Sequence, residues 1–354
     1  MGDQNIGFAL ERVASQQSDV TAIVELKKFK GDHFQTKAFT YAELESLCSE
    51  YVRGFFDLGV KKGDRVALLV PASAALYALT FALYRLGAVV IFVDPGIGVK
   101  RMGRCLDEAE PDYFVGVLKA QLARIVLGWG RKTLKTSILV GPRWLAPGRS
   151  LAYLQDIGRR SSTRMLPETS GTDEAAILFT SGSTGAPKGV IYSHDIFSKQ
   201  IDLLRSMYRI EPGEVDLPTF PLFGLFDPAL GMTTIIPDMN PTKPAKADPL
   251  RLVTAIRQFG VTNLFGSPAL LDTLTRYTTE GGLKFPALKR VLSAGAPVGR
   301  VVLKRVKAML DGGADLHTPY GATECLPVAS ISGSELLEES VRTRNQSGGG
   351  VCVG

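Results

Sequence analysis

The stretch that decides the fold is RVALLVPASAALYALTFALYRLGAVVIFVD, residues 65–94. An apolar run rich in β-branched residues ends at Pro71, an Ala- and Leu-rich run with helical spacing continues to Gly87, and a second apolar run ends at Asp94. This order predicts a strand, a helix and a strand, which is a parallel βαβ unit with helices covering both faces of the sheet. The nineteen charge-free residues 66–84 are long enough to span a bilayer, but Pro71 and the change of period favour the βαβ unit.

The same alternation of strands and helices is predicted along the rest of the chain. Thr40 is a plausible N-cap with Glu43 three residues later, so a helix is expected from there to Gly59. Residues 145–172, with prolines, serines and threonines, are expected to form a surface connection. Further helices are expected at 101–110, 195–208, 250–259, from 268, and at 298–310, with strands at 113–115, 175–180, 219–226 (TFPLFGLF), 232–238, 262–267 and 289–295. The pattern is α/β throughout.

Composition excludes several classes of protein. The 354 residues are 45% hydrophobic and 21% charged, which excludes disorder and a small disulfide scaffold, and the length favours two packed units. The net charge of +6 comes from basic pairs with acids between them, so we expect anionic small ligands rather than nucleic acid. Four cysteines without a CxxC pair and three scattered histidines predict neither zinc nor disulfides. With no secretory signal at the start, a cytoplasmic protein is expected.

The clearest chemical signal is TSGSTGAPKG, residues 180–189, which follows one predicted strand and precedes the β-like GVIY. Its glycines, hydroxyls and Lys188 offer the backbone N–H groups and the cation that a polyphosphate needs. Lys188 follows a proline and no helix is expected after it, so the loop differs from the P-loop of common NTPases. A loop between strands is therefore predicted to wrap the phosphates.

This loop resembles the phosphate-binding signature of the adenylate-forming superfamily of acyl-CoA synthetases and AMP-dependent ligases. Two later segments, SAGAP at 293–297 and YGATE at 320–324, are similar to its adenine-binding turn and its adenine-and-magnesium motif. The resemblance implies ATP and Mg²⁺ as cofactors. It implies phosphate binding by Thr180, Ser181, Gly182, Ser183, Thr184, Gly185 and Lys188, and adenine contacts by Gly295, Ala296, Pro297 and Tyr320. It also implies cofactor binding by Gly321, an α-phosphate contact by Thr323 and magnesium binding by Glu324. Lys188, Thr323 and Glu324 are then the candidate catalytic residues.

The resemblance also implies a fold, the large N-terminal domain of this superfamily, with two layered α/β subdomains and mostly parallel sheets. Residues 60–210 are expected to form the first layer, and residues 1–59 with 211–330 the second. Residues 331–354 are expected to begin an incomplete β-barrel. The superfamily's mobile C-terminal domain is expected to lie outside residues 1–354, which would make the chain a truncated AMP-binding domain.

The substrate side rests on PLFG at 221–224, where Gly224 replaces the histidine usual in acyl-CoA synthetases. With VDPGIG (93–98), NLFGSPALL (263–271) and HTPYGATECLP (317–327), the chain is most similar to the β-lactone synthetases of bacterial long-chain olefin biosynthesis. That resemblance implies a 2-alkyl-3-hydroxy fatty acid, activated as acyl-AMP and closed to a β-lactone. Phe223, Gly224, Phe226 and Ser267 are the candidate acid-binding residues, although the apolar content suits an ordinary core equally well.

Two other functions stay open at this point: an acyl-CoA or acyl-AMP ligase, and a non-catalytic nucleotide- or lipid-binding module. The expected partner is a small carboxylic acid, with no nucleic acid and no transmembrane segment, and an association with other enzymes of lipid biosynthesis is left open. His194 and His317 are expected to be structural, and Cys325 to be a packing residue because the sequence identifies no base for it.

Overall fold

The structure, a computed structural model, describes residues 4–146, 149–162, 166–179, 188–344 and 350–354. The chain divides into two compact units, one made of residues 1–19 and 40–203 and the other of residues 20–39 and 204–354. This division differs from the expected subdomains, because residues 1–19 and 40–59 belong to the first unit. Most of residues 40–59 form helix α2 (Tyr41–Asp57), which packs against three other helices of that unit.

The first unit contains a six-stranded sheet in the order β6-β5-β3-β4-β7-β8. Neighbouring strands are parallel except for the last pair, in which β8 runs antiparallel to β7. The predicted βαβ unit is confirmed: its strands are fully buried at Val66, Val90 and Ile91. The strands are β3 (Arg65–Leu69), β4 (Val89–Val93), β5 (Tyr113–Val117), β6 (Thr136–Val140), β7 (Glu174–Phe179) and β8 (Gly189–Ser193).

Helices connect these strands, and the caps predicted from sequence are present. The Thr40 side chain accepts from the Glu43 N–H while the Glu43 carboxylate accepts from the Thr40 N–H, which is a complete capping box. One prediction was wrong: residues 151–160 are helical within the expected surface connection, with Ser150 as N-cap. The helices besides α2 are η2 (Ile6–Phe8), α1 (Ala9–Gln16), α3 (Ala74–Arg85), η3 (Pro95–Ile97), α4 (Val99–Ala109), α5 (Leu118–Leu127), η4 (Arg143–Leu145), α6 (Leu151–Arg160) and α7 (His194–Tyr208), which continues into the second unit.

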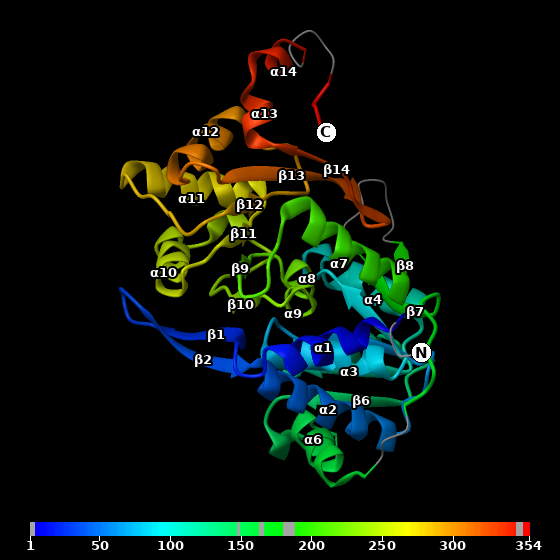
Figure 1. The fold of residues 1–354 in the computed structure, drawn as a ribbon. Helices are drawn as coiled ribbons and strands as arrows, with labels where there is room; N and C mark the ends of the chain where they lie inside the picture. Colours follow the sequence, from blue (N-terminus) through cyan, green and yellow to red (C-terminus); the bar gives the residue numbers. More distant parts are fainter. Residues whose placement is uncertain (1–3, 147–148, 163–165, 180–187, 345–349) are drawn as a thin grey trace. The chain divides into compact units, whose positions relative to one another are not determined.

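The second unit contains an eight-stranded sheet in the order β14-β13-β12-β11-β9-β10-β1-β2. The pairs from β13 to β1 are parallel, and β14 is antiparallel to β13. The β1–β2 hairpin comes from the start of the chain and completes one edge (Figure 1, blue). The strands are β1 (Thr21–Phe29), β2 (Phe34–Thr40), β9 (Val215–Pro218), β10 (Thr233–Ile236), β11 (Asn263–Phe265), β12 (Arg290–Leu292), β13 (Asp315–Ala322) and β14 (Cys325–Ser332).

Helices α10 to α12 pack on this sheet through Leu252, Leu274 and Val306, which share one core with Leu217 and Leu264 of the strands. The prediction of a strand at TFPLFGLF (residues 219–226) was wrong. Its residues form the helical turn α8, and α9 follows, because Pro221 and Pro228 suit the first turn of a helix. The helices are α8 (Pro221–Gly224), α9 (Asp227–Leu230), η5 (Pro244–Lys246), α10 (Pro249–Phe259), α11 (Pro268–Glu280), α12 (Arg300–Met309), α13 (Gly333–Leu337) and α14 (Glu339–Arg344). Residues 333–337 and 339–344 are helical. The expectation that residues 331–354 begin a β-barrel stays a prediction.

The charge-free run of residues 66–84 does not form a membrane span. Its helical part, α3, has 12 residues, and Ser73 caps its N-terminus by accepting from the Leu76 N–H. Within the described parts of the chain, no helix is long and apolar enough to cross a bilayer.

Candidate functional site

The predicted phosphate loop joins two antiparallel strands of the first unit. Strand β7 leads into it, and β8 leads out with Gly189 paired to Phe179. The expected strand after the loop is therefore confirmed, and the loop does not open a helix as a P-loop does. Thr180, Ser181, Gly182, Ser183, Thr184 and Gly185 lie outside the described residues, whereas Lys188 is described and exposed.

The remaining candidate residues lie at one edge of the sheet in the second unit. Pro218, Phe265, Leu292 and His317 are paired in register across four neighbouring parallel strands, β9, β11, β12 and β13. The chain beyond each of them carries one group of candidates. In open α/β sheets ligands bind outside the carboxyl ends of the strands, and this row marks that edge.

The candidate acid-binding residues gather there. Phe223 of α8 stacks on Phe265 with ring centroids 4.2 Å apart, and Gly224 is buried. Phe226 precedes α9 and is partly buried. Ser267 follows β11, but its hydroxyl accepts from the Leu270 N–H at 3.3 Å as the N-cap of α11. The cap gives Ser267 a structural task, and its role toward an acid stays a prediction.

The candidate adenine turn follows β12. Gly295 has φ +91°, a conformation that favours glycine, and Ala296 and Pro297 beside it are exposed. Two residues earlier, Ser293 is 1% exposed and its hydroxyl has no hydrogen-bond partner among the described residues. We add Ser293 to the candidates, because an unsatisfied buried hydroxyl at a ligand-facing edge is available to a polar ligand group. The SAGAP motif contained it, but no sequence signal separated it from a core serine.

Tyr320, Thr323 and Glu324 lie on a hairpin that the sequence did not predict. Ala322 pairs with Cys325, so Thr323 and Glu324 are the two residues of the turn between β13 and β14. Gly321 is required here, because a Cβ would lie 2.4 Å from the Cys325 carbonyl oxygen. The hairpin holds Glu324 exposed and leaves 54% of Tyr320 exposed at the end of the sheet.

The family follows from a comparison across nearly the whole chain, in which residues 10–352 match the sequence model of the AMP-binding enzyme family. The chain belongs to this family. It is 48% identical over 353 residues to the olefin β-lactone synthetase of Stenotrophomonas maltophilia, covering 99% of this chain and 62% of that protein. It is 45% identical over 352 residues to the olefin β-lactone synthetase of Xanthomonas campestris, again covering 99% of this chain and 62% of the relative. The chain thus spans about three fifths of these relatives.

A solved structure agrees with the assignment of the fold. A long-chain fatty-acid–CoA ligase from Archaeoglobus fulgidus superposes with a TM-score of 0.78 at 20% identity, covering 92% of this chain and 66% of that one. The predicted fold, the N-terminal domain of adenylate-forming enzymes with mostly parallel sheets, is confirmed.

AMP-binding enzymes generally use Mg²⁺ with ATP, and the candidate residue for such an ion is Glu324. The described residues contain no cluster of three or more His, Cys, Asp or Glu side chains that would hold a metal by themselves. Magnesium usually takes one or two carboxylates and completes its shell with waters and substrate phosphates. An exposed Glu324 in a tight turn fits that pattern.

The two conspicuous histidines are packed in this AMP-binding enzyme as the sequence led us to expect. His194 has no exposed surface, lies edge-on to Tyr84 with ring centroids 6.0 Å apart, and burial lowers its pKa to about 4. His317 contacts the Tyr208 ring at 5.4 Å, and burial lowers its pKa as well. Both rings are therefore neutral at pH 7. Cys325 is exposed, so the expectation that it is a packing residue was wrong.

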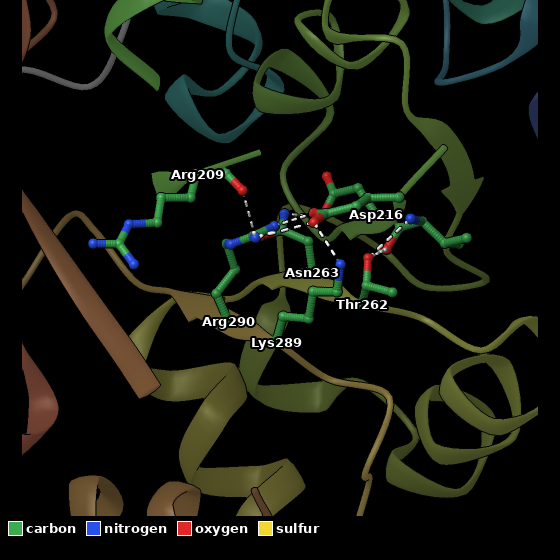
Figure 2. Close-up of polar contacts among 8 residues, drawn as sticks. Arg209, Asp216, Thr262, Asn263, Lys289 and Arg290 are labelled. Atoms are coloured by element: carbon green, nitrogen blue, oxygen red, sulfur yellow. Dashed lines mark hydrogen bonds and ion pairs between the residues drawn. The ribbon is translucent and has the colours of Figure 1, made fainter. Parts of the chain in front are cut away.

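A buried polar network lies in the same sheet as the candidate site, farther from the carboxyl ends of the strands (Figure 2). Asp216, Asn263 and Arg290 are paired in register on β9, β11 and β12, two residues before the row at the carboxyl edge, and the half-buried Asp315 continues this register on β13. Arg290 makes a bidentate ion pair with Glu214, and Lys289 Nζ lies 3.0 Å from the same carboxylate. Burial alone raises the pKa of Glu214, but these hydrogen bonds and charges hold it below its ordinary value.

A second acid joins this network from α9. Asp227 is buried, hydrogen-bonds Asp216, and accepts from Thr234 Oγ1 at 2.9 Å. Burial raises the pKa of Asp216, and burial together with the Asp216 charge raises the pKa of Asp227 well above its ordinary value. Two neighbouring buried carboxyl groups favour keeping a proton between them over ionising both. The pair ties α9 to β9 and β10, and so fixes the end of the segment that carries Phe223 and Gly224.

Proposed function

We propose that this protein uses ATP to activate a carboxylic acid as an acyl-adenylate and then closes a β-lactone from it. The observation that carries the proposal is the 48% and 45% identity, over 99% of the chain, to two proteins named olefin β-lactone synthetase. The proposed substrate is a long-chain 2-alkyl-3-hydroxy acid, the acid whose own hydroxyl can close such a ring.

The nucleotide roles follow the order of the motifs. The loop of residues 180–185 and Lys188 hold the β- and γ-phosphates, and the exposed turn Gly295–Pro297 lines the adenine. Tyr320 stacks on the base, Gly321 lets the hairpin strands approach closely, Thr323 contacts the α-phosphate, and Glu324 binds magnesium. The structure supports this proposal at one point in particular: the adenine turn follows β12, and Tyr320 lies near the end of β13, the neighbouring parallel strand of the same sheet.

The proposed reaction has two steps, adenylation of the acid and closure of the lactone ring. A carboxylate oxygen of the acid attacks the α-phosphorus of ATP, and the bond to the bridging oxygen breaks to release pyrophosphate. The 3-hydroxyl oxygen then attacks the activated carbonyl carbon, AMP leaves with the oxygen that joined it to the acyl group, and the hydroxyl proton passes to the medium. The protein aligns two anions in the first step and fixes one rotamer of the acid in the second.

The candidate acid-binding residues support a reaction in which the 3-hydroxyl of the same acid, and not coenzyme A, accepts the acyl group. Gly224 stands where a histidine is usual in acyl-CoA synthetases, and the aromatic rings of Phe223 and Phe265 line the same edge. A hydroxyl held two carbons from the activated carbonyl is already in place, so no second substrate has to be bound. The acyl-CoA ligase is the alternative that the experiment must separate.

The test uses two matched long-chain acids, with and without the 3-hydroxyl, each assayed with ATP in the presence and absence of coenzyme A. The proposal expects AMP, pyrophosphate and a β-lactone from the hydroxy acid, unchanged by coenzyme A, and only acyl-AMP from the plain acid. Mass spectrometry identifies the products. Thioesters from both acids would reject lactone formation and favour the ligase, whereas ATP binding without any product from either acid would favour a non-catalytic module.

A further inference from the structure

Helix α5 of the first unit buries a polar side chain and exposes its large apolar ones. Its one buried residue is the polar Gln121, whose Nε2 donates to the Ile138 carbonyl at 2.9 Å and so ties the helix to β6. Small residues, Ala120 and Ala123, supply the contact with the core. A surface helix of a globular protein normally turns its apolar stripe inward, so the outward face of α5 requires another explanation.

That outward face is apolar. Leu118, Leu122, Ile125 and Val126 recur at helical spacing and are exposed, with 65% of Ile125 and 80% of Val126 accessible. Leu127 at the end of the helix is also exposed. Large apolar side chains are scattered singly on ordinary surfaces, whereas a continuous stripe marks an interaction surface.

The connection that follows β6 carries a second exposed apolar group, with Trp144 in it. Val117, directly before α5, pairs with Val140 at the end of β6, so the chain leaves the sheet at adjacent points toward α5 and toward η4. Trp144 of η4 is 76% exposed and Leu145 is exposed beside it. Tryptophan is enriched where proteins meet the interface of a bilayer. We define the apolar stripe as Leu118, Leu122, Ile125, Val126, Leu127, Trp144 and Leu145.

Basic residues accompany the stripe. Residues 113–155 contain seven Lys and Arg and no Asp or Glu, so this segment alone exceeds the +6 of the whole chain. Lys135 is paired with Asp64 and Asp112, and Arg143 with Asp156. The exposed Lys119 on α5, and the exposed Arg131 and Lys132 just after it, add positive charge beside the stripe.

We propose that the apolar stripe is a docking surface for a lipid bilayer that contains anionic phospholipid. An apolar helix face flanked by lysines and arginines matches the two parts of such a surface, the acyl boundary and the anionic headgroups. A second copy of the chain matches less well, because a two-fold interface would bring Lys119, Arg131 and Lys132 against the same charges of its partner. The proposal is independent of the function proposed above.

The test is sedimentation of the chain with vesicles of phosphatidylcholine alone, and of phosphatidylcholine with phosphatidylglycerol at about two to one. We expect binding to the anionic vesicles only. The variant Leu122→Ser/Ile125→Ser/Val126→Ser should lower the partition coefficient ~10-fold or more. The variant Lys119→Gln/Arg131→Gln/Lys132→Gln should lower it ~100-fold, at about fivefold per charge.

A matched control changes an exposed apolar and an exposed basic residue of α12, in Val301→Ser/Lys304→Gln, and should bind as the unchanged chain does. Circular dichroism checks that each variant is folded, which surface positions permit. Equal binding to neutral vesicles, equal losses in the control, or no vesicle binding would overturn the proposal. If the serine variant instead turns a dimer into a monomer without affecting vesicle binding, the stripe binds a second copy.

Discussion

Replacing Asp227 by asparagine should make the stability of the second unit less dependent on pH. Asp227 and Asp216 are two neighbouring buried carboxyl groups, and burying both favours the uptake of a proton, which asparagine does not need. In the native chain Asp227 hydrogen-bonds Asp216 and accepts from Thr234 at 2.9 Å. The asparagine side chain has the shape of a protonated aspartic acid. Its oxygen accepts from Thr234 while its amide donates to Asp216, so the variant keeps both contacts without taking up a proton.

The magnitude follows from proton linkage. Burial and the Asp216 charge raise the pKa of Asp227, whereas the unfolded chain has an aspartate pKa of about 3.9. Wherever the pH lies above the unfolded pKa and below the raised native pKa of Asp227, the native state binds a proton that the unfolded state does not, so its stability falls as the pH rises. One such proton corresponds to about 1.4 kcal/mol of stability per pH unit. The asparagine variant escapes this loss.

The assay is urea unfolding at pH 6, 7 and 8, followed by far-UV circular dichroism, for the unchanged chain and for Asp227→Asn. The difference in free energy of unfolding should grow in favour of the variant as the pH rises, with about 1.4 kcal/mol per pH unit as the upper limit for one proton. Asp311→Asn, which removes an exposed acid from the same unit, is the control and should leave the pH dependence unchanged. If the variant and the unchanged chain lose stability in parallel as the pH rises, Asp227 is ionised in the native state and the shared proton does not exist.

Three further predictions concern the hairpin and the ion pair. Glu324→Gln should abolish the magnesium dependence of ATP binding measured by calorimetry, and an unchanged dependence would reject the role given to Glu324. Gly321→Ala should destabilise the second unit by about 1–3 kcal/mol in urea unfolding and weaken ATP binding, because its Cβ would meet the Cys325 carbonyl at 2.4 Å; full stability would show that the hairpin shifts freely. Arg290→Met should cost about 3–5 kcal/mol by leaving the buried Glu214 charge with Lys289 alone, and adding Glu214→Leu should recover most of it; no recovery would mean that lost packing is the cause.

Sequence predicted the elements whose local signals agree with their packing. The βαβ unit of residues 65–94 and the capping box of Thr40 and Glu43 are of this kind, since period and cap chemistry act within a few residues. TFPLFGLF misled because aromatic residues favour strands, whereas two prolines and the stacking of Phe223 on Phe265 produce short helices. That ring contact joins residues 42 positions apart, which no local pattern can reveal.

The candidate site shows the same limit. The YGATE motif singled out Tyr320 and Glu324 as candidate residues. It did not predict the hairpin that exposes them, because that hairpin depends on the pairing of β13 with β14. The buried pair Asp216 and Asp227 was not predicted, because a lone acid in an apolar segment gives no sign of which distant acid it meets. Only the register of β9, β11 and β12 brings their partners together.

The β1–β2 hairpin gives the second unit a peculiar order of assembly during synthesis. Its strand β1 pairs with β10, so that Thr21 and Thr233, which share a hydrogen bond, are 212 residues apart. At ribosomal rates of roughly 5–20 residues per second, the hairpin emerges ~10–40 s before its neighbour exists. During that interval it presents an unpaired edge to solvent or to a chaperone. A nascent chain arrested before residue 233 should therefore leave residues 20–39 open to protease, and release of the arrest should protect them.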